Sequence, residues 1–232
     1  MKIAVLGSNV VGQTLAEKLN SLGHEVMIGT RNVKDTMARS GSDSFGRPPF
    51  SDWHTKNAGI KVGTLSEAAF FGEFIVNATN GVNSIAALEQ AGVKNLANKI
   101  ILDIANPLDF SKGMPPTLSV CNTDSLGEQI QRAFPYTKVV KALNTMNAYI
   151  MVNPALIPED HNVFLSSNDE TAKAKVKTLL QSFGWKSHNI IDMRDISTAR
   201  GTEQLLPIWV RLWGTLQNPM FNFKIAIGPK PN

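Results

Sequence analysis

Short apolar runs alternate with helix-patterned segments along most of this 232-residue chain. Such alternation is typical of units in which a crossover helix joins two parallel strands. We therefore expect an α/β fold built on a doubly wound, mainly parallel sheet. The predicted strands span residues 3–6, 26–28, 60–62, 74–78, 100–104, 138–142, 163–166 and 187–191.

Two regions interrupt the alternation. Residues 40–51 are rich in Ser, Gly and Pro, which predicts a long loop. Residues 195–216 have a helical pattern and too many large apolar side chains for a solvated tail, and Pro207 is expected to kink this helix. We expect a main domain over residues 1–194 and a small helical C-terminal segment over residues 195–232. This segment would pack on the main domain, on a partner subunit, or on both.

Composition narrows the environment in which the chain would act. The net charge is +4, but the basic residues are scattered, so we expect no nucleic-acid partner. The longest apolar run falls short of the roughly 18 residues of a membrane span, and the N-terminus does not resemble a signal peptide. Cys121 is the single cysteine and has no cationic neighbour in sequence, so we expect a buried, unreactive thiol in a reducing, cytoplasmic compartment.

The stretch "KIAVLGSNVVGQTLAEKL" places Gly7 directly after a predicted strand and Gly12 inside the helix that follows. This is the context of the dinucleotide-binding fingerprint of Rossmann-type folds, in which glycines allow a tight turn and close helix packing. Asn9 stands where the middle glycine is usual. Asn9 can adopt a positive φ at lower cost than most residues, and its amide can donate to a phosphate oxygen. The alternative is a purely structural turn.

The second predicted strand ends in Thr30 and Arg31, with Asn32 and Lys34 following. NAD-binding proteins place an acidic residue near this position, where it binds the ribose hydroxyls and repels a 2′-phosphate. A hydroxyl and a guanidinium would instead bind that phosphate. The pattern favours NADP over NAD, unless Arg31 is simply a solvated surface charge.

Several segments, taken in order, resemble a known family. They are "IAVLGSNVVGQTLAEKLNSLGHEVMIGTR", "FIVNATNG", "IILDIANPLD", "VVKALNTMNA" and "TEQLLPIWVRLWGTLQNPMFNFKIA". The chain is similar to the coenzyme F-420-dependent NADP oxidoreductases and to the related cytosolic domains of six-transmembrane ferric reductases. The resemblance implies hydride transfer between NADP(H) and a flavin or deazaflavin. It also implies a homodimer formed through the C-terminal segment.

The resemblance assigns roles position by position. The phosphate loop would be Gly7, Ser8, Asn9, Val10, Val11 and Gly12, and the 2′-phosphate site would be Thr30, Arg31 and Lys34. Thr79, Asn80 and Gly81 would border the ribose and pyrophosphate. Ala105, Asn106 and Pro107, together with Asn144, Met146 and Ala148, would flank the nicotinamide, with Asn106, Asn144 and Met146 positioning it for hydride transfer. Read only as sequence, the Asn-Gly and Asn-Pro pairs are also ordinary turn residues.

Acid–base chemistry has few candidates in the sequence. None of His24, His54, His161 and His188 lies in a predicted strand-exit loop of the site, and their spacing with Cys121 predicts no metal site. Hydride transfer between two rings needs no strong acid or base, because the cofactors supply the chemistry. Two alternatives stay open. One is an NADP-dependent reductase of a small carbonyl or imine, for which Lys141 is the nearby proton donor, and the other is a nonenzymatic NADP-sensing protein.

Overall fold

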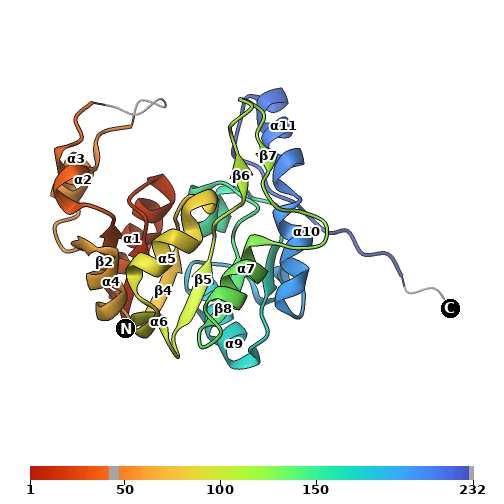
Figure 1. Ribbon diagram of the computed structural model, residues 1–232. Coiled ribbons are helices and arrows are strands. Elements are labelled where there is room, and N and C mark those ends of the chain that lie inside the picture. The colour runs from red at the N-terminus through yellow and green to blue at the C-terminus, as the bar shows by residue number, and fades with distance from the viewer. Residues whose placement is uncertain (42–46, 230–232) are drawn as a thin grey trace.

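The computed structural model describes residues 1–41 and 47–229. Eight strands form one sheet in the order β10-β9-β8-β5-β4-β1-β2-β3. Helices cover both faces (Figure 1). The strands are β1 (Lys2–Leu6), β2 (Glu25–Thr30), β3 (Lys61–Thr64), β4 (Phe74–Asn77), β5 (Ile100–Asp103), β8 (Lys138–Ala142), β9 (Val163–Ser166) and β10 (Ile190–Asp192). This confirms the predicted doubly wound α/β fold, and each predicted strand is present with small shifts at its ends.

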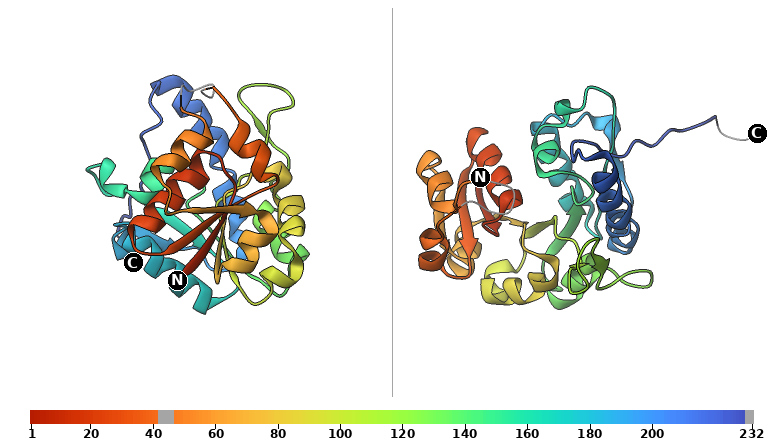
Figure 2. Two further views of the ribbon diagram at one scale, coloured as in Figure 1. Left: turned by 90° about the vertical axis from the view of Figure 1, so that its left-hand side faces the viewer. Right: turned by 90° about the horizontal axis from the view of Figure 1, so that it is seen from above.

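The sheet is parallel from β3 through to β8, and then its direction changes. β9 pairs antiparallel with β8, and β10 pairs parallel with β9. The starts of β9 and β10 therefore lie at the same edge as the ends of the other strands. Seen from above, the N-terminal elements lie on one side of the molecule and the C-terminal elements on the other, with the middle strands between them (Figure 2).

Alternating strand residues feed two hydrophobic cores, one on each face of the sheet. Ile3 and Val5 belong to one core, and Ala4 and Leu6 to the other. The first core packs α1 (Val10–Ser21), α3 (Phe50–Lys56), α8 (Ala148–Val152) and α9 (Glu170–Ser182) on the sheet. The second packs α4 (Leu65–Phe71), α5 (Ser84–Ala91), α6 (Val93–Leu96), α7 (Leu126–Ala133) and α10 (Ala199–Glu203).

Two elements were not expected from the sequence. Helix α2 (Val33–Ala38) follows β2, with the Asn32 side chain accepting a hydrogen bond from the Asp35 N–H at 3.1 Å. A small hairpin of β6 (Leu108–Asp109) and β7 (Thr117–Leu118) follows β5. The expected loop at 40–51 ends earlier, because α3 begins at Phe50, and its residues 42–46 lie outside the described residues. Cys121, expected to be buried, is exposed in the loop between β7 and α7.

The C-terminal segment is anchored at two places. After a 3₁₀ turn at Ile196–Thr198, α10 packs against α7, where Arg200 forms an ion pair with Glu128 at 2.6 Å. Helix α11 (Leu206–Leu216) follows, and Pro207 lies in its first turn, so this proline begins a helix rather than kinking one.

Beyond α11 the chain returns to the sheet edge. The N–H of Asn162 donates to the Phe223 carbonyl at 2.9 Å, and the N–H of Ile225 donates to Asn162 Oδ1 at 2.7 Å. The division of the chain at residue 194 stays a prediction. The first residues after it, Ile196 and Ala199, are part of the second core.

Candidate dinucleotide site

The predicted phosphate loop joins β1 to α1. Gly7 has a φ of +123°, which side chains of L-residues rarely allow, and its N–H donates to the Gly29 carbonyl at 2.9 Å. A Cβ on Gly12 would lie only 2.0 Å from the Gly7 carbonyl oxygen. The turn therefore needs glycine at both positions. The backbone N–H groups of Val10 and Val11 open the helix without partners inside it, which makes this a site for an anion.

Asn9 does not do what the sequence suggested. Its φ is −77°, not positive, and it caps α1 by accepting from the Gly12 N–H at 3.0 Å. Its amide nitrogen donates to the Ala78 carbonyl at 2.9 Å, so it is not free for a phosphate. A capping asparagine satisfies a helix N–H that has no other partner, and this preference outweighs a left-handed conformation here. Asn9 thus ties the phosphate loop to the exit of β4.

A cavity of about 360 Å³ opens beside this loop at the ends of β2 and β4. Arg31 and Arg39 reach it from the end of β2 and the end of α2. Thr30 is buried at its floor, with its hydroxyl 2.7 Å from that of Thr36. Lys34 lies in the first turn of α2, exposed, and does not line the cavity. The lining residues are Gly7, Ser8, Asn9, Gly29, Thr30, Arg31, Arg39, Leu65, Thr79, Asn80, Asn83, Ala86, Ala87 and Gln90.

Sequence reasoning missed Arg39, Leu65 and Gln90 in this lining. These residues come from three helices and meet only in the folded chain. Arg39 had a usable signal, because Asn32 and Asp35 in "RNVKD" are typical of a helix start and would have predicted α2. The cavity thus has two guanidinium groups at its rim, which suits a phosphate better than one.

A second cavity of about 210 Å³ continues the first along the sheet edge, and both are lined by Asn9, Thr79 and Asn80. Its further walls come from the first turn of α1, from the exits of β4 and β5 and from the β6–β7 hairpin. They are Val11, Ala78, Gly81, Ile104, Ala105, Asn106, Leu108 and Phe110. Among these described lining residues, no side chain carries a charge. The two cavities form one groove with a cationic rim at one end and neutral walls at the other.

Asn106 and Asn144 bridge the exits of β5 and β8. The Asn106 amide donates to the Asn144 carbonyl at 2.8 Å, and the Asn144 amide donates to Asn106 Oδ1 at 2.9 Å. Each amide group thus holds the neighbouring loop in place. Pro107 continues the β5 exit, and its carbonyl accepts from the Ser119 N–H at 2.8 Å, which connects this exit to the hairpin.

Met146 and Ala148 lie beyond Asn144, where α8 begins, and both are buried. Asn147 caps this helix by accepting from the Tyr149 N–H at 3.0 Å. Among the described residues, neither Met146 nor Ala148 is part of the lining of the second cavity. Their contact with a nicotinamide therefore stays a prediction.

Lys141 proves to be unsuited to the proton transfer considered for it. Its ammonium is fully buried in β8, 2.8 Å from Asp103 and 2.8 Å from Glu203. Burial disfavours the charged ammonium, but the two carboxylates outweigh this effect and raise the pKa of Lys141 above the ordinary lysine value. A buried, strongly basic ammonium held by two carboxylates is a poor acid.

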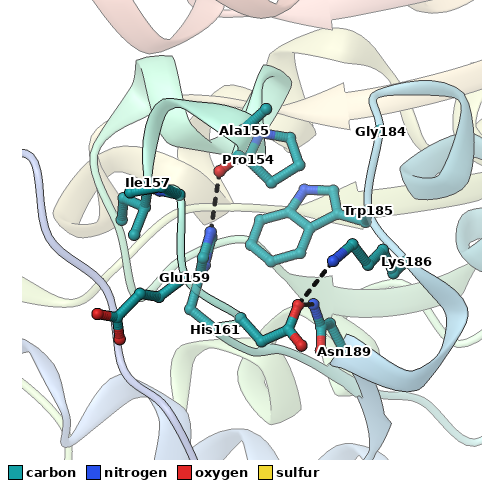
Figure 3. A pocket seen from close by; sticks show the side chains of 11 residues that line it. Pro154, Ala155, Ile157, Glu159, His161, Gly184, Trp185, Lys186 and Asn189 are labelled. Atoms are coloured by element: carbon teal, nitrogen blue, oxygen red, sulfur yellow. Dashed lines mark hydrogen bonds and ion pairs between the residues drawn. The ribbon is translucent and has the colours of Figure 1, made fainter.

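A separate cavity of about 170 Å³ lies near the starts of β9 and β10 (Figure 3). His161 is buried beside it, and the antiparallel direction of β9 brings this histidine to the same edge of the sheet as the groove. Its Nε2 lies 3.0 Å from the Pro154 carbonyl and its Nδ1 lies 2.7 Å from the Asn222 amide. Both ring nitrogens are engaged, so His161 holds the tail to the sheet and is not a free acid or base.

Comparison with known proteins identifies the family. The family described as NADP oxidoreductase, coenzyme F420-dependent, matches residues 2–107. A solved structure from Arthrobacter sp. FB24, described as a candidate F420-dependent NADP-reductase, is 57% identical, with a TM-score of 0.92. The alignment covers 98% of this chain and 100% of that one. The chain belongs to the coenzyme F-420-dependent NADP oxidoreductase family. It is an NADP-dependent oxidoreductase, an enzyme of hydride transfer.

More distant relatives of this NADP oxidoreductase share its fold. Metalloreductase STEAP3 of Rattus norvegicus is 25% identical over 90% of this chain, which spans 38% of the length of that relative. An imine reductase from Myxococcus stipitatus, solved in complex with NADP+, is 14% identical with a TM-score of 0.61. That alignment covers 94% of this chain and 64% of the imine reductase, and it is a likeness of fold alone.

Two further observations describe this member of the family. Within the described ranges, none of its helices has the length and apolar character needed to cross a membrane. Over the same ranges, His, Cys, Asp and Glu side chains form no group of three that could hold a metal ion.

Proposed function

We propose that this enzyme transfers a hydride between NADP(H) and a flavin or deazaflavin. The observation that carries the proposal is the neutral second cavity, which continues the groove from the cationic rim. Direct transfer between two stacked rings requires close placement and exclusion of water, and needs no acid or base from the protein. The family description, which includes coenzyme F-420, supports the same co-substrate class.

The described residues suit the dinucleotide. The Gly7–Gly12 cradle would be closed by any added Cβ, and it leaves the helix N-terminus open to a pyrophosphate. Arg31 and Arg39 would bind the 2′-phosphate, with the Thr30 hydroxyl below them, and Lys34 would add only a longer-range charge. Ser8, Thr79 and Asn80 would border the ribose and phosphates. When bound, NADP(H) and its co-substrate supply the hydride chemistry themselves.

The residues of the neutral end would position the nicotinamide. The Asn106–Asn144 pair fixes the two loops on either side, Ala105 lines the cavity between them, and Pro107 follows Asn106 in the same loop. In our proposal the carboxamide is bound by backbone groups near Met146 and Ala148. The apolar side chains of Val11, Ile104 and Phe110 would exclude water from the space where the rings meet.

The alternatives are less well supported. A carbonyl or imine reductase needs a proton donor in its pocket, and Lys141, the candidate for this role, is buried between Asp103 and Glu203. The likeness to imine reductases is one of fold. A nonenzymatic sensor has no support from the family, whose members are named as oxidoreductases.

Anaerobic mixing experiments would test the proposed co-substrate. NADPH-loaded enzyme is mixed in parallel with FMN, FAD, riboflavin and a deazaflavin, and the loss of absorbance of each ring is followed with time. We expect rapid reduction of at least one of the four, with NADPH oxidised in equal amount. Turnover of a cyclic imine or a small ketone with no reduction of any of the four rings would overturn the proposal in favour of the rival.

We further propose a homodimer through the C-terminal segment. Ile208 and Leu216 on α11 are 49% and 55% exposed, and only Leu206 and Val210 of this apolar helix are buried. Such exposure of large apolar side chains on one helix is typical of an interface. Light scattering should give twice the chain mass for the wild-type enzyme and the chain mass for Ile208→Asp with Leu216→Asp. A wild-type monomer at high micromolar concentration would contradict the proposal.

A further inference from the structure

Three charged side chains from distant parts of the chain meet beneath the groove. Lys141 Nζ lies 2.8 Å from Asp103 Oδ2 and 2.8 Å from Glu203 Oε1. The side chains of Lys141, Asp103 and Glu203 are 0%, 0% and 2% exposed. Strands β5 and β8 and helix α10 each contribute one of them. We call these three residues the buried triad.

The buried triad holds the backbone of Ala105, in the β5 exit, by two hydrogen bonds. The Lys141 ammonium donates to the Ala105 carbonyl, and Asp103 Oδ1 accepts from the Ala105 N–H at 3.2 Å. Ala105 lines the second cavity and begins the loop against which we place the nicotinamide. Its N–H and its carbonyl, the polar groups on either side of its Cα, are thus bonded to the same ion pair.

The contacts continue to a second wall of the groove. Asp103 Oδ1 also accepts from the Asn77 amide at 2.8 Å, and Asn77 Oδ1 accepts from the Thr79 hydroxyl at 2.7 Å. Thr79 lines both cavities. The buried triad is therefore bonded directly to the exit of β5 and, through the Asn77 amide, to the exit of β4. Arg31 and Arg39 take no part in these contacts.

Stability alone does not account for three buried charges. Removing them from water costs several kcal/mol per ion, and an apolar replacement of similar volume is often as stable or more so. The far carboxylate is well satisfied, since Glu203 accepts from the N–H groups of Leu126 and Gly127 at 2.8 and 3.0 Å, at the N-terminus of α7. Three apolar side chains in these positions could not form hydrogen bonds with the Ala105 backbone. The charged residues form two, and these fix its orientation.

We infer that the buried triad is a positioning unit, in which Lys141 sets the Ala105–Pro107 loop against the nicotinamide ring of NADP(H). This inference rests on the proposed placement of the nicotinamide in the second cavity. It gives Lys141, whose own backbone contact is to Ala105, a role at the nicotinamide end of the groove and no contact with the 2′-phosphate site. If Lys141 only stabilised the fold, its replacement would weaken ligand binding at both ends of the groove.

Calorimetry with two ligands separates these roles. NADPH occupies both ends of the groove, whereas adenosine 2′,5′-bisphosphate has the 2′-phosphate and lacks the nicotinamide. For Lys141→Met we expect the NADPH dissociation constant to rise about tenfold or more, the loss typical of a broken charge-assisted contact. The bisphosphate should bind within about twofold of wild type, and the fluorescence of bound NADPH should shift toward that of free NADPH.

Lys173 offers a matched control. It is also a mostly buried lysine held by two carboxylates, Asp192 at 2.9 Å and Glu170 at 2.8 Å, at the far edge of the sheet. Its two carboxylate partners are exposed, unlike Asp103 and Glu203, so Lys173→Met controls for loss of a mostly buried ammonium without touching the β5 exit. It should lower the melting temperature and leave the dissociation constants of both ligands and the fluorescence of bound NADPH unchanged.

Lys141→Met leaves two unpaired carboxylates in the interior, so a neutral variant accompanies it. Asp103→Asn, Lys141→Met and Glu203→Gln together remove all three charges and should recover stability while still lacking the ammonium on Ala105. The inference predicts that NADPH binding stays weak in this folded variant. Recovery of NADPH affinity together with stability, or equal loss for both ligands, would overturn it. Because no electron acceptor is used, failure of the proposed co-substrate does not affect these measurements.

Discussion

In our proposal the two ends of the groove use opposite means of recognition. At the adenosine end, exposed guanidinium groups of Arg31 and Arg39 stand at the rim, and their charge is directed at a ligand. At the nicotinamide end the walls are neutral, and the charges of Asp103, Lys141 and Glu203 lie beneath them, directed at the backbone. A 2′-phosphate is recognised by its own charge, whereas a neutral reactive ring needs a rigid, water-excluding wall. The difference explains why charge is exposed at one end and buried at the other.

Replacing Gly12 should have the largest effect, because it affects both ends at once. The new Cβ of Gly12→Ala would lie 2.0 Å from the Gly7 carbonyl oxygen, so the loop or the helix must move. We expect the free energy of unfolding to fall by about 3 kcal/mol, with loss of both NADPH and adenosine 2′,5′-bisphosphate binding. Urea unfolding and calorimetry measure the two effects. Gly201→Ala is the control, since nothing lies within 4 Å of its added Cβ.

Arg31→Ala tests the adenosine end alone. We expect NADPH to lose about 1–3 kcal/mol of binding free energy, the range for a charge-assisted hydrogen bond, and NADH to lose almost none. Arg39→Ala should show the same selectivity with a smaller loss. Arg132→Ala, at an exposed ion pair on α7, is the control. Equal losses for NADH and NADPH would mean that Arg31 does not contact the 2′-phosphate.

Phe110→Ala tests the nicotinamide end from the hairpin. Phe110 is 50% exposed and lines the second cavity, so its ring is placed to contact the co-substrate. We expect the KM of the electron acceptor to rise by a factor that corresponds to about 1 kcal/mol, with little change in NADPH affinity. Met114→Ala, at an exposed methionine of the same hairpin, should change neither value. A rise in the NADPH dissociation constant alone would place Phe110 against the nicotinamide.

The smallest expected effect lies outside the groove, at the Glu128–Arg200 pair. Hydrogen bonds from the Arg200 guanidinium, opposed by burial and aided by the Ser125 hydroxyl, hold the pKa of Glu128 below its ordinary value of 4.5. A carboxyl with a lowered pKa in the folded state stabilises above its unfolded pKa, and the stabilisation is lost as pH falls through the folded value. Below pH 4.5 the free energy of unfolding of the wild type should therefore fall by on the order of 1 kcal/mol. Glu128→Gln lacks this ionisable group, so its stability should not show this fall. Thermal melts across this pH range, with bound NADPH absent, measure it; parallel curves for both proteins would contradict it.

The strands could be predicted because each is a short apolar run bounded by polar residues, a local signal. The reversal at β9 could not, because the run at Val163–Ser166 reads the same in either direction. Hairpin β6–β7 has strands of two residues each, too short for any periodicity. Helix α2 has a local signal in its capping residue Asn32, but with six residues it is too short to show a helical period.

The site residues also fall into those with a local sequence signal and those set by long-range contacts. Gly7, Gly12 and Arg31 are local in sequence. Gly7 and Arg31 line the groove as expected, and Gly12 packs beneath it against the Gly7 carbonyl. Asn9 was misassigned because its partner, Ala78, is 69 residues away and belongs to another strand exit. The buried triad was missed for the same reason, since Lys141 and Asp103 are 38 residues apart and no spacing rule connects them.

The C-terminal segment has a consequence for how such enzymes diversify. Helix α11 is held at both ends. Before it, Arg200 pairs with Glu128 and Glu203 pairs with Lys141; after it, Asn162 forms hydrogen bonds with the chain near Phe223. Because contacts at the two ends, together with the buried Leu206 and Val210, hold the helix, substitutions along its outward side leave the enzyme's interior intact. In the proposed dimer, mutation of that side would change the partner that α11 binds and leave the buried triad unchanged.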